Sequence, residues 1–269
     1  MFTAQQEQAF LEACDDWQFL LFLSLTLTGV RPGELCHLLL PDDLDLDAAL
    51  LRVRNKPRLG WQVKTRNERD IPLVPVLAEV LRCHLDQRRL GPVFLRRTFR
   101  PSPSPGTLPV KGLEAELARR GAEQEQQAGQ PLSRVERGRL AQRLWRQLGT
   151  VKEDRVRLEF LRLTRVIGLP GCTAPKMLRH QFATALQEGR VDPLIRNELM
   201  GHVAAGERSA GHGLGMTAVY THTRAETRRQ QLEQALHDRP AVLVARHWLD
   251  AHQGAQGLIR SDFASLLHE

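Results

Sequence analysis

Tyr220 is the only tyrosine in the 269-residue chain and lies in the segment MTAVYTHT, residues 216–223. A phenol becomes a nucleophile once its proton is removed. At neutral pH only about a thousandth of free tyrosine is phenolate, so attack needs a base or a strongly positive surround. A lone tyrosine is also typical of an aromatic ring packed at a helix edge, so the residue type alone leaves both interpretations open.

Four other segments, which precede the tyrosine along the chain, carry arginine, lysine or histidine side chains. A single arginine after a helix, a lysine between strands or a lone histidine is usually structural or solvent-exposed, so each alone is a weak signal. The combination is the signal. The segments are TGVRPGEL with Arg31, VKTRNERDIPL with Lys64, PKMLRHQFAT with Lys176 and Arg179, and ELMGH with His202.

In this order the segments resemble the catalytic domain of the phage integrase (tyrosine recombinase) family. That domain carries a helix ending in TGxRxxEL, then a three-stranded sheet with a lysine in the turn between its second and third strands. An HxLRH helix, an LGH segment and a YTH-like segment with the nucleophile follow. The resemblance covers most of the chain, and five elements in the correct order make it specific.

The resemblance implies roles for Tyr220 as the nucleophile and for Arg31 and Arg179 as the two phosphate-binding arginines. Two guanidinium groups that fork the non-bridging oxygens both position a phosphodiester and neutralise charge that grows in the transition state. His202 would donate a hydrogen bond to a non-bridging oxygen. These four residues therefore form the core of the expected catalytic site.

Two lysines complete the set of residues implied by the resemblance. Lys64 matches the lysine of the sheet and would protonate the departing 5′-oxygen as a general acid. Lys176 stands where the family has the first histidine of HxLRH, a replacement also found in some of the related type IB topoisomerases. A lysine could accept the phenol proton only if burial or neighbouring cations lower its pKa.

The chain departs from the family in two further ways. His202 and Tyr220 are 18 residues apart, about twice the family's usual gap, and AAGERSAGHGLG forms the surplus. The family also carries an N-terminal helical domain that clamps DNA, and here the catalytic segments begin almost at Met1. We therefore expect that clamp to be absent, to lie on another chain, or to be replaced in part by residues 96–170.

The function implied by the resemblance is DNA breaking and rejoining by site-specific recombination, through a 3′-phosphotyrosyl intermediate, in a mobile-element integrase. Such an enzyme needs neither metal nor ATP, and the sequence has no P-loop or metal-type acidic cluster; His202, His212 and His222 lack cysteine partners for zinc. The implied partners are double-stranded DNA and further copies of the chain, as a tetramer on paired sites. Two alternatives stay open: topoisomerase-like relaxation and a catalytically silent DNA-binding protein.

Composition agrees with an intracellular, nucleoid-associated protein. The net charge of +7 favours a polyanionic partner, and no apolar stretch is long enough to predict a membrane span. Four scattered cysteines without a CxxC pair predict neither a disulfide framework nor a zinc site. Residues 131–170 hold ten Lys or Arg against four acids, a net of +6, so nearly the whole excess lies in one segment.

The expected fold is mainly α with a small three-stranded antiparallel sheet, as one catalytic domain over residues 1–269. Helices are predicted over 4–14, 16–29, a short stretch from Pro32, 75–89, 176–189, 193–201, 224–237 and 239–253. Asp15 or Asp16 is the expected N-cap of the second helix, and Gly29 is expected to end it. Strands are predicted over 49–55, 60–67 and 69–75.

Residues 96–170 change in character and are expected to form a basic helical insertion or subdomain within the catalytic domain. A Pro/Ser loop opens the segment, and a helical pattern then runs to about Val166. Its basic run is typical either of a solvated helix face or of a surface that follows DNA phosphates. The candidates for DNA contact are Arg134, Arg139, Arg143 and Arg146.

Overall fold

The computed structural model describes residues 1–99, 108–202 and 224–252, and this part of the chain is mainly helical with two small antiparallel sheets, which confirms the predicted fold class. The helices are α1 (Ala4–Glu12), α2 (Asp16–Thr28), α3 (Pro32–Leu35), α4 (Pro75–Leu85), α5 (Val110–Ala128), α6 (Arg134–Gln147), α7 (Glu153–Val166), α8 (Lys176–Glu188), α9 (Pro193–Met200) and α11 (Ala225–Leu236), with a further helix over 240–252. The strands are β1 (Leu39–Leu40), β2 (Leu44–Asp45), β3 (Leu50–Val53), β4 (Arg69–Pro72) and β5 (Gly91–Pro92), and a 3₁₀ turn, η1, covers Pro57–Leu59.

The first two helices begin where the sequence predicts and end slightly earlier, at Glu12 and Thr28. Thr3 and Asp15 cap α1 and α2, each with a glutamine three residues on that completes a capping box. Gly29 ends α2 with φ +62°, a left-handed conformation that suits glycine. The ring of Phe182 would come within 2.2 Å of any β-carbon at this position, so the glycine lets α8 approach the end of α2.

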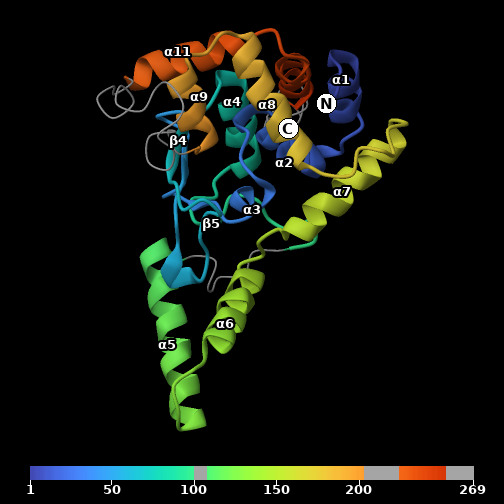
Figure 1. The fold of residues 1–269 in the computed structure, drawn as a ribbon. Coiled ribbons are helices and arrows are strands. Elements are labelled where there is room, and N and C mark those ends of the chain that lie inside the picture. The colour runs from blue at the N-terminus through green and yellow to red at the C-terminus, as the bar shows by residue number, and fades with distance from the viewer. Residues whose placement is uncertain (100–107, 203–223, 253–269) are drawn as a thin grey trace, which may run out of the picture.

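The main core surrounds α2, which is buried almost all round and packs against α1, α4 and α8 (Figure 1). Its largest fully buried side chains include five phenylalanines drawn from α1, α2, α7 and α8. These are Phe10, Phe19, Phe22, Phe160 and Phe182. Helices far apart in the sequence are therefore fixed against one another by one apolar cluster.

The three-stranded sheet differs from the prediction in one strand. Its order is β2-β3-β4, so the first strand is Leu44–Asp45, and the prediction of a strand over 60–67 was wrong. Residues 60–67 lie in the connection between β3 and β4, because the side chain of Asn55 accepts a hydrogen bond from Val63 N and donates one to Arg66 O. These side-chain contacts take the place of the backbone hydrogen bonds between strands, and the segment forms a compact loop.

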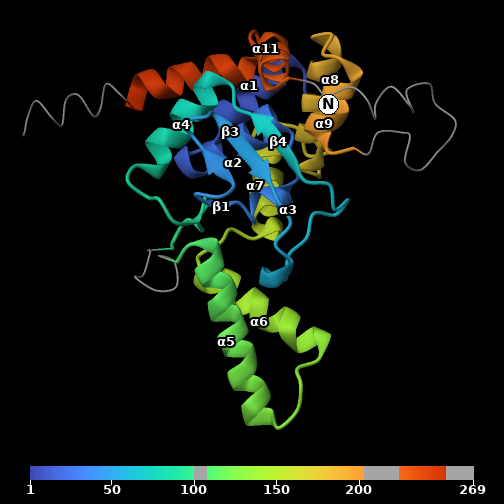
Figure 2. The same cartoon turned by 90° about the vertical axis from the view of Figure 1, so that its left-hand side faces the viewer.

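Helices α5 and α6 project from the body as a two-helix arm (Figures 1 and 2). A second, smaller apolar cluster, the arm cluster, includes Leu113, Leu117, Leu140 and Leu144 of the arm together with Leu39 and Leu59 at its base. Trp145 ties the arm to the body by donating a 2.9 Å hydrogen bond to Leu59 O in η1.

Within the predicted segment 96–170, the arm cluster ends at Leu148, whereas Val151, Val156 and Phe160 belong to the main core. The helical pattern predicted up to Val166 is three helices, α5, α6 and α7, and the chain turns between Leu148 and Lys152 before the last of them. Gly149 has φ +81° in this turn. Helix α7 therefore packs with the body, and the projecting part is shorter than the composition indicates.

His37 lies at the junction between the arm and the body. Its ring stacks on Trp61 and meets the edge of Trp145, with ring centroids 4.8 Å apart in both pairs. Nδ1 lies 2.7 Å from Gly33 O, so Nδ1 carries the proton and donates it. Burial, with a smaller contribution from the charge of Lys56, lowers the pKa of His37 from 6.5 to about 4.

This lowered pKa predicts acid sensitivity. Above pH 6.5 the ring is neutral in both the folded and unfolded states; between 6.5 and about 4 only the unfolded state binds the proton, so stability falls with pH. The loss is at most about 3 kcal/mol. Urea unfolding at pH 7 and pH 4.5 measures how much the free energy of unfolding falls between the two pH values. This decrease should be smaller for His37→Phe than for wild type.

The control is His247→Phe, at an exposed site, which should show the same decrease as wild type. Equal losses in all three proteins would contradict the assignment.

Among the helices within the described ranges, none is long and apolar enough to cross a membrane.

Candidate active site

Arg179 is the most buried of those predicted site residues that the structure describes, at 5% exposure. From α8 it donates 2.6 Å to Gly29 O and also donates to Met200 O. These carbonyls lie at the C-terminal ends of α2 and α9, where helices leave acceptors unsatisfied and carry partial negative charge. One guanidinium thus joins two helix ends. Burial and the charges of Arg31 and Arg69 lower its pKa to about 10, so it remains charged at neutral pH.

Arg31 lies two residues beyond Gly29, at the start of α3. Its Nη1 donates 2.7 Å to Glu34 Oε1, and its backbone N donates 2.8 Å to Glu34 Oε2. The Arg31 side chain is 24% exposed, whereas that of Glu34 is 2% exposed. Glu34 therefore holds Arg31 from the protein side and leaves part of the guanidinium open to a ligand.

A second arginine, Arg69, holds Glu34 from within the protein. Its Nη2 lies 2.6 Å from Glu34 Oε2 and its Nη1 3.2 Å from Oε1, a bidentate pair. Burial alone would raise the pKa of the Glu34 carboxyl, but the hydrogen bonds and charges of Arg69 and Arg31 together lower it. The carboxylate is therefore ionised between two arginines. Neither Glu34 nor Arg69 is among the site residues predicted from the sequence.

His202 follows α9 directly and is exposed. Its backbone N donates 2.9 Å to Asn197 O, and Gly201, with φ +62°, makes the turn that presents it. Partial burial of the ring and the charges of Arg179, Arg31 and Arg69 lower the pKa of His202. The imidazole therefore lies within electrostatic reach of all three arginines and is neutral at pH 7.

The two lysines lie at the edge of this arrangement. Lys176 is the first residue of α8, three positions before Arg179, and Lys64 is in the turn between β3 and β4, the second and third strands of the sheet. Both are exposed, and within the described ranges neither makes an ion pair. The structure thus brings Arg31, Arg179 and His202 together and places both lysines on the surface beside them.

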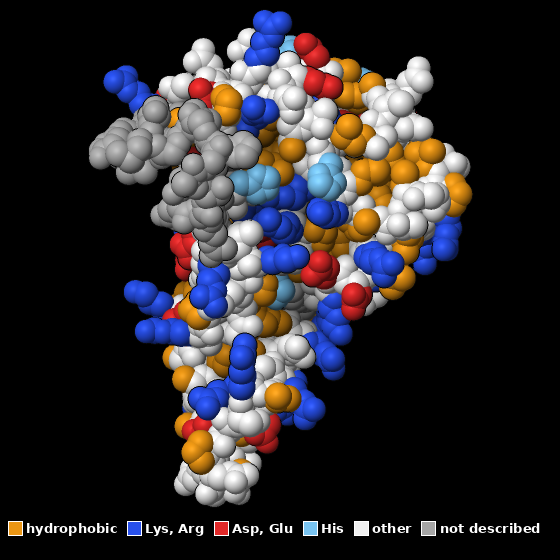
Figure 3. Space-filling view, viewed as in Figure 1, with side chains coloured by type: hydrophobic (Ala, Val, Ile, Leu, Met, Phe, Trp, Pro, Cys, Tyr) orange, Lys and Arg blue, Asp and Glu red, His pale blue; other side chains and the backbone are white. Residues whose placement is uncertain are grey.

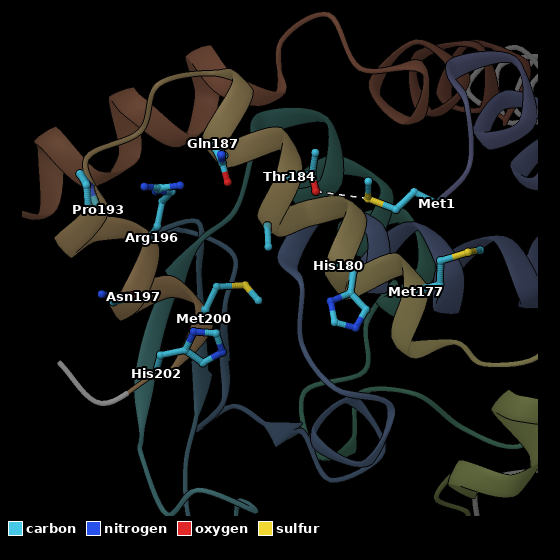
Figure 4. Close-up of a pocket in the computed structure, with 11 residues that line it drawn as sticks. Met1, Met177, His180, Thr184, Gln187, Pro193, Arg196, Asn197, Met200 and His202 are labelled. Atoms are coloured by element: carbon cyan, nitrogen blue, oxygen red, sulfur yellow. Dashed lines mark hydrogen bonds between the residues drawn. The ribbon is translucent and has the colours of Figure 1, made fainter. Parts of the chain in front are cut away.

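A cavity of about 700 Å³ opens beside His202, between α8 and α9. His180 and His202 project into it from the two sides, with Arg196 and Asn197 along α9 (Figure 4). His180 is one helical turn after Lys176 and is not among the site residues predicted from the sequence. A second, open hollow of about 520 Å³ lies on the other side of His202, against Arg66, Asn67 and Glu198.

Histidine, lysine and arginine side chains gather in the middle of the face seen in Figure 3, and further Lys and Arg follow along the arm below them. Across the parts of the chain that the structure covers, no group of three or more His, Cys, Asp or Glu could hold a metal ion. Tyr220 lies outside the described residues, as does the Gly-rich stretch before it, so its predicted role stays a prediction.

Comparison with known proteins identifies the family. Residues 1–227 match the phage integrase family, and the chain therefore belongs to it, as the sequence motifs predicted. No curated protein matches the sequence.

Solved structures with a similar arrangement include XerA recombinase, at 18% identity and a TM-score of 0.48, over 87% of this chain and 64% of that one. The Tn1549 transposon integrase in complex with a circular intermediate DNA gives 19% identity and a TM-score of 0.49, over 87% and 65%. The Y379F variant of that integrase, in complex with transposon right end DNA, has 18% identity and a TM-score of 0.49, over 87% of this chain and 65% of that one. The chain thus spans less than two thirds of the length of each.

Proposed function

We propose that this chain breaks and rejoins DNA by site-specific recombination, as a metal- and ATP-independent tyrosine recombinase of the integrase type. The observation that carries the proposal is the convergence of Arg31, Arg179 and His202 from three separate segments, with the outer part of Arg31 left open. Membership of the phage integrase family supports it. The proposed substrate is double-stranded DNA.

The charge of the site suits a phosphodiester under attack. Three arginines and one glutamate, Arg31, Arg69, Arg179 and Glu34, leave a net charge of +2. A pentacoordinate phosphorane carries about one more negative charge than the diester, so fixed positive charge stabilises it more than the ground state. The arginines are held before DNA arrives, which reduces the reorganisation that the reaction requires.

In the proposed step, the Tyr220 oxygen forms a bond to phosphorus as the bond to the 5′-oxygen breaks. The phenol proton passes to a base, and Lys64 supplies a proton to the 5′-oxygen, so the products are a 3′-phosphotyrosyl link and a free 5′-hydroxyl. His202 donates to a non-bridging oxygen through its neutral ring. Lys176, the first residue of α8, is the proposed base.

Reversal of the step by a 5′-hydroxyl from another strand rejoins the DNA, since the phosphotyrosyl link conserves the energy of the broken bond. Exchange between two duplexes then requires four protomers on paired sites. We include this tetramer, and a location on the nucleoid, in the proposal.

A nicked suicide substrate tests the function. Cleavage just upstream of the nick releases a short fragment, so the covalent intermediate cannot religate and a protein–DNA adduct accumulates. An adduct confined to particular sites supports recombination. Relaxation of supercoiled plasmid without site preference would instead favour the topoisomerase-like alternative, and tight binding without cleavage at any site would favour a silent DNA-binding protein.

The arm supplies the proposed DNA contacts away from the scissile phosphate. Helix α6 holds five arginines and one glutamate, a net of +4, whereas α5 holds three basic and four acidic residues, a net of −1. Arg139, Arg143 and Arg146 recur at helical spacing and share one exposed face of α6. Arg134, the fourth candidate, lines a cavity of about 730 Å³ between α5 and α6 instead.

Replacing Arg139, Arg143 and Arg146 with glutamine is expected to lower the salt dependence of DNA binding. Each lost phosphate contact reduces the slope of log K against log salt by roughly 0.9, so the triple variant should lose up to about 3 from the slope. Fluorescence anisotropy with duplex DNA over a salt series measures this.

The matched control replaces Arg119 and Arg120 on α5 with glutamine, because both are already paired with Glu116. The control should keep the wild-type slope. An unchanged slope in the α6 variant, or an equal reduction in both, would overturn the assignment of this face.

A further inference from the structure

Arg69 is a buried cation that contacts two of the three segments of the candidate active site. Its side chain is only 3% exposed, so it cannot itself reach DNA. Besides its two bonds to Glu34, its Nε donates 2.9 Å to Leu199 O near the end of α9. One planar guanidinium on β4 thus joins the Arg31 segment to the segment that presents His202.

The Glu34 carboxylate is fully occupied. Oε1 accepts from Nη1 of Arg31 and Nη1 of Arg69, and Oε2 accepts from the backbone N of Arg31 and Nη2 of Arg69. A carboxylate with four charge-assisted or backbone donors has one low-energy orientation. The orientation of the Arg31 guanidinium is therefore set from the far side of Glu34, by Arg69.

The contact with the His202 segment is equally close. A β-carbon at Gly201 would lie 3.0 Å from both Cδ and Nη1 of Arg69, so the backbone packs directly on the arginine. Asn67, two residues before Arg69, donates 3.3 Å from Nδ2 to Gly201 O. The β3–β4 connection that carries Lys64 is thereby joined to the turn that carries His202.

We propose that Arg69 is a positioning residue for DNA cleavage: through Glu34 and through the Leu199–Gly201 backbone it holds Arg31 and His202 in fixed register around the scissile phosphate. The inference rests on the proposed function for its catalytic consequence. Lysine cannot replace it, because a single ammonium cannot bond both carboxylate oxygens and a carbonyl in one plane.

Arg69→Lys is expected to slow single-turnover cleavage of a nicked duplex by about 100-fold at saturating DNA, with little change in DNA affinity, because misplacement of about 1 Å has that cost. If Arg69 acts through Arg31, the two changes are not additive. In the Arg31→Ala background, Arg69→Lys should then slow cleavage by clearly less than 100-fold, because only its contribution through the His202 segment remains.

Arg52→Lys is the matched control, because Arg52 on β3 pairs with Asp45 on β2, away from Arg69. It should cleave at close to the wild-type rate. Cleavage by Arg69→Lys at the wild-type rate would overturn the proposal. So would a double variant whose fold-reduction in cleavage rate equals the product of the two single reductions, because that is the result for two residues that act independently.

Hydrogen exchange separates failure of this inference from failure of the proposed function. The backbone N–H groups of Gly201 and His202 donate to Glu198 O and Asn197 O. In Arg69→Lys their exchange should rise at least about tenfold while α4 keeps its protection. This readout holds even if wild type forms no adduct, and unchanged exchange at both amides would contradict the positioning role.

Discussion

The Tyr220→Phe variant is expected to form no covalent adduct with a nicked DNA duplex, although it should bind that duplex with wild-type affinity. Phenylalanine keeps the ring and removes only the oxygen that attacks phosphorus. The chain holds no second tyrosine that could substitute. Loss of a nucleophile costs on the order of 10⁴-fold or more in rate, which places the residual reaction below detection on a denaturing gel.

Binding by anisotropy is the control for this variant, since its affinity should be unchanged if the protein is folded. An adduct that persists in Tyr220→Phe would show that another side chain attacks the phosphate. A parallel loss of binding would show that the phenol supports DNA affinity rather than chemistry.

The second large effect is expected at Arg179. Replacement by alanine removes the donors to Gly29 O and Met200 O, both at helix ends inside the protein. Loss of two charged hydrogen bonds should reduce the free energy of unfolding by about 3 kcal/mol. Loss of a phosphate-stabilising guanidinium should slow cleavage by about 10²- to 10³-fold or more.

Because the alanine variant can fail for lack of stability, Arg179→Lys is measured beside it. Lysine keeps the charge and can bond one of the two carbonyls, so we expect a smaller loss of unfolding free energy but a cleavage defect of the same order. Arg165→Ala, at an exposed site on α7, is the control and should behave as wild type. A stable Arg179→Lys variant that cleaves at the wild-type rate would show that cleavage does not depend on the planar guanidinium of Arg179.

The sequence predicted the features that depend on local chemistry. Asp15 and Gly29 mark the ends of α2 because capping and left-handed turns are decided within a few residues. The order of Arg31, Arg179 and His202 also predicted that they share a site, through the family resemblance. Their convergence is a property of the fold, since Arg179 bonds a carbonyl 150 residues away.

Features that depend on long-range contacts were missed. The strand predicted over 60–67 is a loop because Asn55 binds its backbone, a contact that alternation of apolar residues does not reveal. Arg69 and Glu34 are 35 residues apart in sequence. One signal could have found the pair: Arg69 shares a strand face with the buried Ile71, and a charge on an inward face needs a partner.

The most direct test of the account identifies the residue that carries the DNA. The adduct trapped on a nicked duplex is digested with trypsin and nuclease, and the modified peptide is sequenced by mass spectrometry. We expect a single modified peptide that contains Tyr220 joined to a 3′-phosphate, with Arg31→Ala and Arg179→Lys strongly reducing its yield. A link to any other residue, a 5′-phosphate link, or no adduct at any natural site would contradict it.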